Sequence, residues 1–246
     1  MKVYAKTDRG LTREVNEDDY CIFQNKNGDW LALVCDGIGG SAAGEVASHI
    51  CVSTMRDAFL EAPMFTRDFQ VKEFIQNTLN VANDRIYQEA LTNKNQKGMG
   101  TTAVGLVVTR MASYIFNVGD SRVYADYSDG LIQMSEDHSV IAQLIREGRI
   151  TPEQAKTHPQ KNTLTNALGV WHVFRIDINK IQSNYKFVLL CSDGLHGYVN
   201  HEEIQNIVEN PMYSVSNKVD MLIMRASQAG GFDNCTVILL EKEQGE

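Results

Sequence analysis

The sequence contains no long hydrophobic run, because no stretch approaches the roughly 20 apolar residues that a membrane-spanning helix needs. Residues 1–6 also lack the apolar segment of a secretory signal peptide. The 5 cysteines are odd in number and include no C-x-x-C pair, so neither a disulfide framework nor a zinc site is indicated. We therefore expect reduced cysteines, no membrane insertion and a cytoplasmic location.

Blocks of lysine or arginine are also absent. The chain of 246 residues carries 23 Lys and Arg against 31 Asp and Glu, a formal net charge of -8. This acidic balance argues against nucleic acid as a partner. Internal repeats, low-complexity segments and linker-like stretches are missing too, and 43% of the residues are apolar. We expect a single domain over residues 1–246 with a full hydrophobic core.

What the sequence does contain is a recurring pattern in which an apolar run ends in an aspartate near a glycine. Residues 31–35 lead into Asp36, residues 187–192 into Asp193, and residues 114–119 into Asp120. Near the C-terminus the order is reversed, and Asp233 precedes the apolar residues 235–240. Each run predicts a buried strand whose aspartate is presented to solvent. Because one strand's start lies beside its neighbour's end in an antiparallel sheet, these aspartates can meet at one sheet edge.

Hairpin signals dominate the rest of the chain. Asn27-Gly28 separates expected strands at residues 19–24 and 29–35, and Asp129-Gly130 separates strands at 122–127 and 131–134. Further strands are expected at residues 1–7, 101–109, 113–118, 170–178, 185–191 and 236–241. Helices are expected from a cap at Ser41, from Thr151-Pro152, and over residues 68–91, 139–147, 202–209 and 215–228. Because regular strand–helix alternation is absent, antiparallel sheets covered by helices are favoured over a parallel sheet.

Several carboxylates at one sheet edge repel one another, so they bind protons or share cations. Because these aspartates are expected to be exposed to water, bound cations are favoured over protons as the neutralising partner. A ligand set made only of oxygen atoms suits Mg²⁺ or Mn²⁺. Two such ions would make a hydrolytic site. Arg13 is a candidate for binding the substrate phosphate, because a guanidinium can bind two phosphate oxygens. Without the neighbouring aspartates, Arg13 would be interpreted as an ordinary surface arginine. Glu17 and Asp18 would likewise be interpreted as a solvent-exposed acidic pair. The cysteines beside the aspartates are interpreted as core fillers rather than zinc ligands: Cys35, Cys191 and Cys235.

Six short motifs follow one another in a characteristic order. They are Arg13-x-x-Asn16-Glu17-Asp18, Asp36-Gly37-x-Gly39-Gly40, Gly100-Thr101-Thr102, Gly119-Asp120-Ser121-Arg122, Ser192-Asp193-Gly194 and Asp233-Asn234. Each motif alone is weak evidence. Their order and spacing from about residue 7 to residue 240 resemble the metal-dependent type-2C protein phosphatases, in the compact form of the bacterial members.

The resemblance implies an α+β fold, a four-layer sandwich of two central antiparallel β-sheets flanked by pairs of α-helices. It also implies a mobile flap at about residues 135–168 beside a two-metal centre. In that centre, Asp36 would bridge both ions and the Gly37 carbonyl would bind one of them. Asp193 and Asp233 would bind the other ion.

The same resemblance implies roles outside the two-metal centre for the remaining motif residues. Glu17 and Asp18 would act through metal-bound waters, and Arg13 would bind the substrate phosphate. Asp120 together with Asp193 would hold a third, weaker ion.

Two positions depart from the family pattern. Animal members have a histidine two residues after the bridging aspartate, where this chain has Ile38. Many bacterial members have a histidine after the glycine pair, where this chain has Ser41. We therefore expect a metal-bound water to supply the proton to the leaving group. His138 and His158 lie in the flap and could contact substrate, but we interpret both as surface residues.

The function implied is a metal-dependent protein serine/threonine phosphatase with two Mn²⁺ or Mg²⁺ ions, whose bridging hydroxide hydrolyses phosphoserine and phosphothreonine. The bacterial match implies partners, namely a membrane serine/threonine kinase and its targets, and we expect a monomer. One alternative is a non-enzymatic phosphoprotein-binding module, which should lack a metal aspartate, whereas this chain has them all. Another is a dedicated regulatory phosphatase of a stress-response switch, which often carries a sensor domain.

Overall fold

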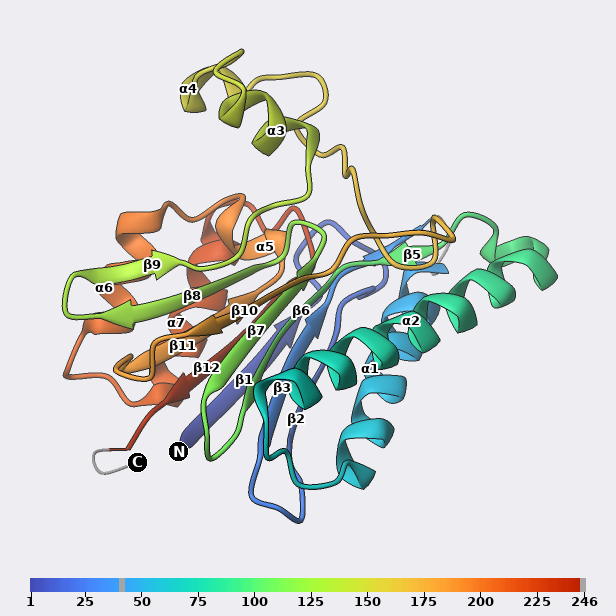
Figure 1. The fold of residues 1–246 in the computed structure, drawn as a ribbon. Helices are drawn as coiled ribbons and strands as arrows, with labels where there is room; N and C mark the ends of the chain where they lie inside the picture. Colours follow the sequence, from blue (N-terminus) through green and yellow to red (C-terminus); the bar gives the residue numbers. More distant parts are fainter. Residues whose placement is uncertain (40–42, 244–246) are drawn as a thin grey trace.

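The centre of the molecule is a pair of antiparallel sheets packed face to face (Figure 1). The computed structural model describes residues 1–39 and 43–243. Within them, the first sheet has the spatial order β1 (Lys2–Asp8), β12 (Cys235–Glu241), β11 (Phe187–Cys191), β8 (Arg122–Tyr127) and β9 (Gly130–Gln133). The second has the order β10 (Asp177–Ile181), β7 (Ser113–Val118), β6 (Ala103–Val108), β3 (Trp30–Cys35) and β2 (Asp19–Gln24). A short ladder joins β4 (Gly37–Ile38) to β5 (Gly100–Thr101).

Helices cover the outer face of each sheet. The pair α1 (Ala43–Glu61) and α2 (Asp68–Thr92) packs on the second sheet, and the turn η1 (Lys94–Gln96) follows α2. The pair α6 (His201–Glu209) and α7 (Val215–Gln228) packs on the first sheet, with the short α5 (Asp193–His196) beside it. The expected four-layer α+β sandwich is therefore confirmed (Figure 1). Across residues 1–39 and 43–243, no helix is long and apolar enough to span a membrane.

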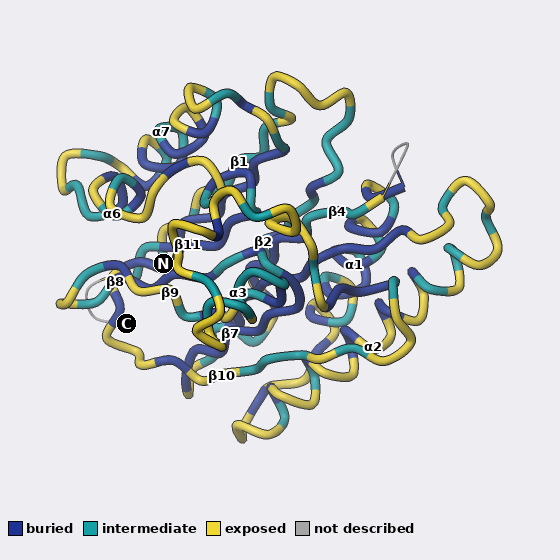
Figure 2. The backbone as a smooth tube through the Cα atoms, turned by 90° about the horizontal axis from the view of Figure 1, so that it is seen from above, coloured by how far each residue is buried: buried dark blue, intermediate teal, exposed yellow. Residues whose placement is uncertain are grey.

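Strand alternation explains why the central strands are apolar along their whole length. Leu31, Leu33 and Cys35 point to the cluster under α1 and α2. Ala32 and Val34, between them, point to the cluster that lies between the sheets. A third cluster lies under α6 and α7. Since both faces of each sheet are covered, both sets of alternating side chains must be apolar, and Figure 2 shows burial concentrated in the strands.

The flap, residues 135–168, stands clear of the sandwich and carries α3 (Val140–Arg146) and α4 (Pro152–Ala155) (Figure 1). Ser139 caps α3 by accepting the N–H of Ala142. Thr151 and Gln154 form a capping box at α4, which is the start predicted from Thr151-Pro152. The flap is exposed over most of its length (Figure 2).

One expected strand is wrong in its position. The strand predicted over residues 170–178 begins only at Asp177. Before that point, side-chain amides bind the backbone: Asn166 bonds both N–H and C=O of Arg175, and Asn83 donates to the carbonyl of Trp171. These bonds replace a strand ladder. The strand expected over 101–109 is interrupted at Thr102, α5 was not expected, and the expected cap Ser41 lies outside the described residues.

Candidate active site

The structure brings the four strand-end aspartates together at one edge of the sandwich. They line a pocket of about 220 Å³ with Arg13, Glu17, the backbone at Gly37 and several neighbours. Asp36 follows β3, Asp120 follows β7, Asp193 opens α5 after β11, and Asp233 precedes β12. Each aspartate is only partly exposed. The expectation that they are simply presented to water therefore needs correction, because they form the floor of a recess.

Backbone hydrogen bonds fix Asp36 at the bottom of this pocket. Its N–H donates to Thr102 Oγ1 at 2.9 Å, and its carbonyl accepts the Thr102 N–H at 2.9 Å. Thr102 Oγ1 lies 2.8 Å from Ser121 Oγ. The interruption between β5 and β6 is thus where Thr102 turns its backbone and hydroxyl to Asp36 rather than to a neighbouring strand.

The next residue, Gly37, sits where two backbone segments meet. A Cβ atom at this position would lie 2.3 Å from the carbonyl oxygen of Gly44 and 2.4 Å from that of Glu17. Only glycine fits such a close approach. Glu17 Oε1 in turn accepts the N–H of Gly44 at 3.0 Å, near the start of α1. The glycine motif therefore serves to bring Glu17, α1 and the Asp36 turn together.

Asp18 lies beneath the pocket rather than in its lining. It is 8% exposed, and its Oδ2 accepts the hydroxyls of Ser192 and Thr236, both at 2.7 Å. Its Oδ1 is buried and has no hydrogen-bond partner among the described residues. Burial raises the pKa of Asp18 to about 7. An unpartnered buried carboxylate oxygen is expensive unless a cation or water binds it.

Crowding raises the pKa of the pocket carboxylates as well. Burial, then the charges of Asp18 and Asp193, hold the pKa of Asp36 well above its usual range. Burial and the charge of Asp233 raise the pKa of Asp193 to about 6. Burial and the charge of Asp193 raise the pKa of Asp120 to about 8. At neutral pH this set must therefore keep protons or be neutralised by a cation.

The donor set fits a hard divalent cation. It consists of carboxylates and a backbone carbonyl, the oxygen ligands that Mg²⁺ and Mn²⁺ prefer, and the unpartnered Asp18 Oδ1 lies beside it. Over residues 1–39 and 43–243, however, no group of three or more His, Cys, Asp or Glu side chains is arranged as a ready ion cage. The cysteines are free and buried in the apolar clusters, which confirms their interpretation as core fillers.

Arg13 supplies a positive group at the pocket mouth. Its Nη2 lies 2.7 Å from Asp233 Oδ1, and its Nε donates to the Phe232 carbonyl at 3.4 Å. The side chain is 45% exposed. A half-exposed guanidinium beside the aspartates has donors left for an anion, and its planar fork suits two phosphate oxygens.

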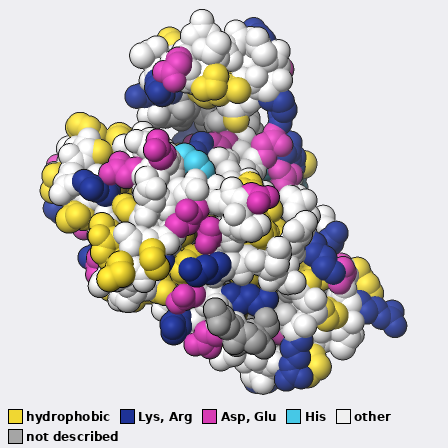
Figure 3. All heavy atoms as spheres, turned by 90° about the vertical axis from the view of Figure 1, so that its left-hand side faces the viewer, with side chains coloured by type: hydrophobic (Ala, Val, Ile, Leu, Met, Phe, Trp, Pro, Cys, Tyr) yellow, Lys and Arg dark blue, Asp and Glu magenta, His cyan; other side chains and the backbone are white. Residues whose placement is uncertain are grey.

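A larger cavity of about 640 Å³ opens between the flap and the body. Asp120, Asp193 and Asp233 line both this cavity and the smaller pocket, so the two spaces are continuous. The flap contributes apolar and basic side chains to its wall: Ile141, Ala142, Ile145, Arg146, Lys156 and Lys161. Figure 3 shows the flap standing over this hollow.

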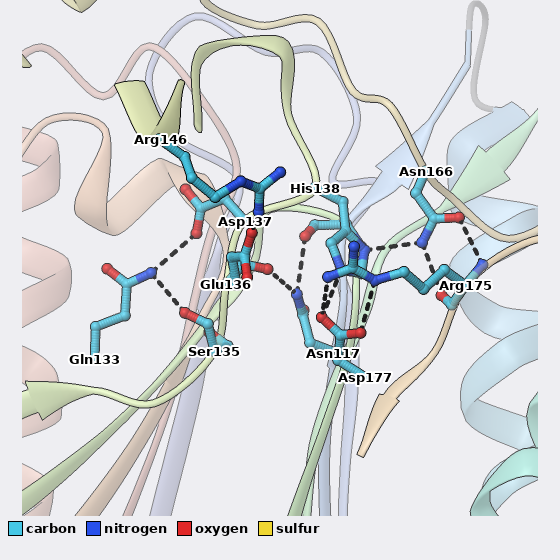
Figure 4. Close-up of polar contacts among 11 residues, drawn as sticks. Asn117, Gln133, Ser135, Glu136, Asp137, His138, Arg146, Asn166, Arg175 and Asp177 are labelled. Atoms are coloured by element: carbon cyan, nitrogen blue, oxygen red, sulfur yellow. Dashed lines mark hydrogen bonds and ion pairs between the residues drawn. The ribbon is translucent and has the colours of Figure 1, made fainter. Parts of the chain in front are cut away.

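Two histidines near the site differ from the sequence-based expectation, because His138 is not at the surface and His196 was not identified as a site residue. His138 is 5% exposed and not a surface residue as expected. It bonds Asn166, Asp177 and Gly119 where the flap leaves the sandwich (Figure 4). His196 Nε2 donates to the Asp120 carbonyl at 3.0 Å, and burial lowers its pKa to about 3.

Comparisons with known proteins agree with this geometry. A model of the protein phosphatase 2C family matches residues 10–227. Serine/threonine phosphatase stp of Listeria innocua is 37% identical over 243 residues, which cover 98% of this chain and 96% of that protein. Protein phosphatase PhpP of Streptococcus pneumoniae is 31% identical over 245 residues, which cover 99% and 98%. The crystal structure of Stp1 from Staphylococcus aureus matches with a TM-score of 0.91 and 35% identity, covering 98% of this chain and 95% of that one.

Proposed function

Because this chain belongs to the protein phosphatase 2C family, we propose that it hydrolyses phosphoserine and phosphothreonine in proteins. The observation that carries the proposal is the pocket in which four aspartates from separate strand ends face Arg13. Such a site binds cations and a phosphate together, which is what a phosphatase of this metal-dependent family requires. The name of its Listeria relative, a serine/threonine phosphatase, supports the same substrate class, and the name of its Streptococcus relative, a protein phosphatase, supports protein substrates.

The aspartate pocket would hold two Mn²⁺ or Mg²⁺ ions. Asp36, the Gly37 carbonyl, Asp193 and Asp233 line this pocket together, and they would be the groups that hold the two ions, with Asp36 shared between them. Glu17, in the pocket lining, and Asp18, with its unpartnered Oδ1, would act through water, and Asp120 with Asp193 would hold a third, weaker ion. Bound ions would lower the pKa of a water molecule and neutralise charge on the phosphoryl oxygens.

Arg13 orients the substrate. It lines the mouth of the pocket and is held beside Asp233, so an incoming phosphate exchanges one anionic partner of the guanidinium for another. Thr102 keeps Asp36 in place during the reaction, because its hydrogen bonds involve the backbone of Asp36 and not its carboxylate, and the Ser121 hydroxyl holds the Thr102 side chain. The flap covers the cavity where the polypeptide around the phosphorylated residue lies.

The physiological partners follow from the substrate class. A phosphatase for phosphoserine and phosphothreonine acts after a kinase that makes them, so we propose a bacterial serine/threonine kinase and its targets as partners in the cytoplasm. The whole chain acts as one domain with the flap at residues 135–168, and it acts as a monomer. The five buried, free cysteines support a reducing compartment.

Hydrolysis of a phosphothreonine peptide tests the proposal directly. Phosphate release is measured with Mn²⁺, with Mg²⁺ and after addition of a chelator. We expect turnover with either metal and none with the chelator. The competing function is a phosphoprotein-binding module, which retains the fold without the chemistry. Binding of the peptide without phosphate release, in the presence of either metal, would favour that alternative.

A further inference from the structure

Three exposed apolar side chains come from chain segments that also line the aspartate pocket or the larger cavity beside it. Leu11 is 70% exposed, Phe232 52% and Tyr198 40%. They come from the segment after β1, the loop before β12 and the turn after α5. The rings of Tyr198 and Phe232 are 5.7 Å apart, and the Leu11 N–H donates to the Gly231 carbonyl at 2.8 Å. We call Leu11, Tyr198 and Phe232 the apolar rim.

The Phe232 ring is held in its exposed position by the loop beneath it. Gly230 has a φ of 129°, and a Cβ atom there would lie 2.1 Å from Cε2 of Phe232, so the ring lies directly over this glycine. The Phe232 carbonyl accepts hydrogen bonds from Thr12 Oγ1 at 3.0 Å and Arg13 Nε at 3.4 Å. An aromatic ring that is fixed before binding loses little conformational entropy when a partner covers it.

The apolar rim is continuous with the catalytic pocket. Asp233, directly after Phe232, lines both the pocket and the larger cavity, and Tyr198 lines the larger cavity beside it. Arg13 lies next to the Phe232 carbonyl. An extended polypeptide advances about 3.3 Å per residue. When the phosphate of a protein substrate reaches Arg13, residues close to the phosphorylated one are therefore within reach of the rim.

We propose that the apolar rim binds an apolar side chain of the protein substrate, located within about three residues of the phosphorylated residue. The inference rests on the proposed function and narrows its substrate class to phosphoproteins with Leu, Ile, Val or Phe near the phosphorylated position. Exposed apolar groups that adjoin a binding site commonly mark a contact with the ligand. Covering one such side chain corresponds to about a fivefold preference in kcat/KM.

The test uses matched phosphothreonine peptides with Mn²⁺ as cofactor. One set carries Leu at single positions up to three residues before or after phosphothreonine, and the reference set carries Asn there. The kcat/KM ratio of each pair is measured for the wild-type chain, Phe232→Ser, Leu11→Ser and Phe232→Leu. Met212→Ser is the control, because Met212 is 85% exposed and belongs to the connection between α6 and α7, not to the segments that carry the apolar rim. Thermal unfolding verifies that each variant is folded.

We expect the wild-type chain to prefer one Leu peptide about fivefold, mainly through KM. Phe232→Ser and Leu11→Ser should lower this ratio toward one, while Phe232→Leu and Met212→Ser retain it. Hydrolysis of all peptides at equal rates would overturn the inference and leave the proposed function intact. Failure to hydrolyse any phosphopeptide would overturn both. A change of oligomeric state in Phe232→Ser without a change in the ratio would also overturn it, since the rim would then contact a second copy.

Discussion

Gly119 and His138 are joined by two hydrogen bonds, one in each direction. The His138 N–H donates to the Gly119 carbonyl at 2.9 Å, and the Gly119 N–H donates to His138 Nδ1 at 3.2 Å. Because a backbone N–H only donates, Nδ1 carries no proton, and Nε2–H donates to Asp177 Oδ2 at 3.0 Å. Gly119 directly precedes Asp120, and His138 lies at the start of the flap (Figure 4). The base of the flap is therefore tied to the pocket.

Replacement of this imidazole should loosen both ends of the flap. His138→Ala leaves the Gly119 N–H and the Asn166 amide without their shared acceptor, which costs about 1–3 kcal/mol of stability. We expect a lower Tm, faster protease cleavage within the flap, and a larger increase in KM for a phosphopeptide than for an aryl phosphate. His158→Ala is the control in the flap. If His138→Ala and His158→Ala show the same Tm, protease cleavage and KM, His138 does not hold the base of the flap.

The sequence predicts the site better than the contacts that hold it in place. Apolar runs ending in Asp-Gly locate Asp36 and Asp193 at strand ends, because strand period and glycine turns are local properties. The bond from His196 to the Asp120 carbonyl joins residues 76 positions apart. The Ser192 hydroxyl that binds Asp18 is 174 positions away. Such partners depend on how the sheets stack, which no local pattern encodes.

The misplaced strand has the same origin. Residues 170–178 contain the alternation of a strand, but Asn166 and Asn83 bind their backbone groups from other parts of the chain. The sequence alone does not predict that His138 is buried, because its flanking residues are polar. Burial at 5% exposure arises from Asn166 and Asp177, which meet it across the base of the flap.

Stability should depend on pH and metal together. In the metal-free fold, the pKa values of Asp193, Asp18 and Asp120 rise to about 6, 7 and 8, against about 3.9 in an unfolded chain. Between the unfolded and the folded pKa values, the folded state binds more protons than the unfolded state. The stability that these carboxyls contribute is therefore fully present at low pH and is lost as pH rises through the folded pKa values of about 6 to 8. We expect the metal-free Tm to fall over this range, and Mn²⁺ to raise Tm more at pH 8 than at pH 6.

Asp18→Asn offers a control for that dependence. The amide keeps an oxygen acceptor for Ser192 and Thr236 and stays neutral at all pH values. The metal-free variant should therefore be more stable than the wild-type chain at pH 8 and lose less stability between pH 6 and pH 8. Asp129→Asn, at an exposed position of the β8–β9 hairpin, should behave like the wild type. If the metal-free Asp18→Asn variant loses as much stability between pH 6 and pH 8 as the wild-type chain, Asp18 is already ionised in the metal-free fold.

Asp36→Asn should abolish metal-dependent hydrolysis. Replacement of an outer-shell partner of a metal site typically lowers activity about 10- to 100-fold. Replacement of Asp36, which is expected to contact both ions, should therefore lower turnover by more than about 100-fold. The fold should survive, because Thr102 binds the backbone of Asp36 and not its carboxylate. Calorimetric titration with Mn²⁺ measures the loss of binding. Wild-type turnover in this variant would contradict the two-metal assignment.

Arg13 should contribute to substrate binding more than to stability. Arg13→Ala removes charge-assisted hydrogen bonds to a phosphate, and we expect kcat/KM for an aryl phosphate to fall about 10- to 100-fold. Arg13→Lys should recover only part of this loss, because an ammonium lacks the planar fork. Arg9→Ala is the matched control: its Nη1 donates to the Glu14 carbonyl and it does not line the pocket. Mn²⁺ titration should be similar in all these variants.

Asp120 is the position where leaving-group chemistry can be separated from metal binding. Its carboxylate lines both the pocket and the cavity under the flap, while its carbonyl accepts the His196 N–H. The two-metal assignment already has ligands in Asp36, Asp193 and Asp233, so Asp120 is available for a third, weaker ion. An alkyl oxygen must be protonated as it leaves, whereas an activated aryl oxygen leaves without much assistance.

Asp120→Ala should therefore reduce turnover of a phosphoserine peptide by at least about tenfold more than turnover of an activated aryl phosphate. The fold should be preserved, because the His196 hydrogen bond involves only the backbone of Asp120. Calorimetry with Mn²⁺ should retain the stronger binding events and lose the weakest one. Equal reduction on both substrates would assign Asp120 to the two-metal centre, since a general loss of ions affects every leaving group alike. Unchanged rates on both substrates would place this carboxylate outside the reaction.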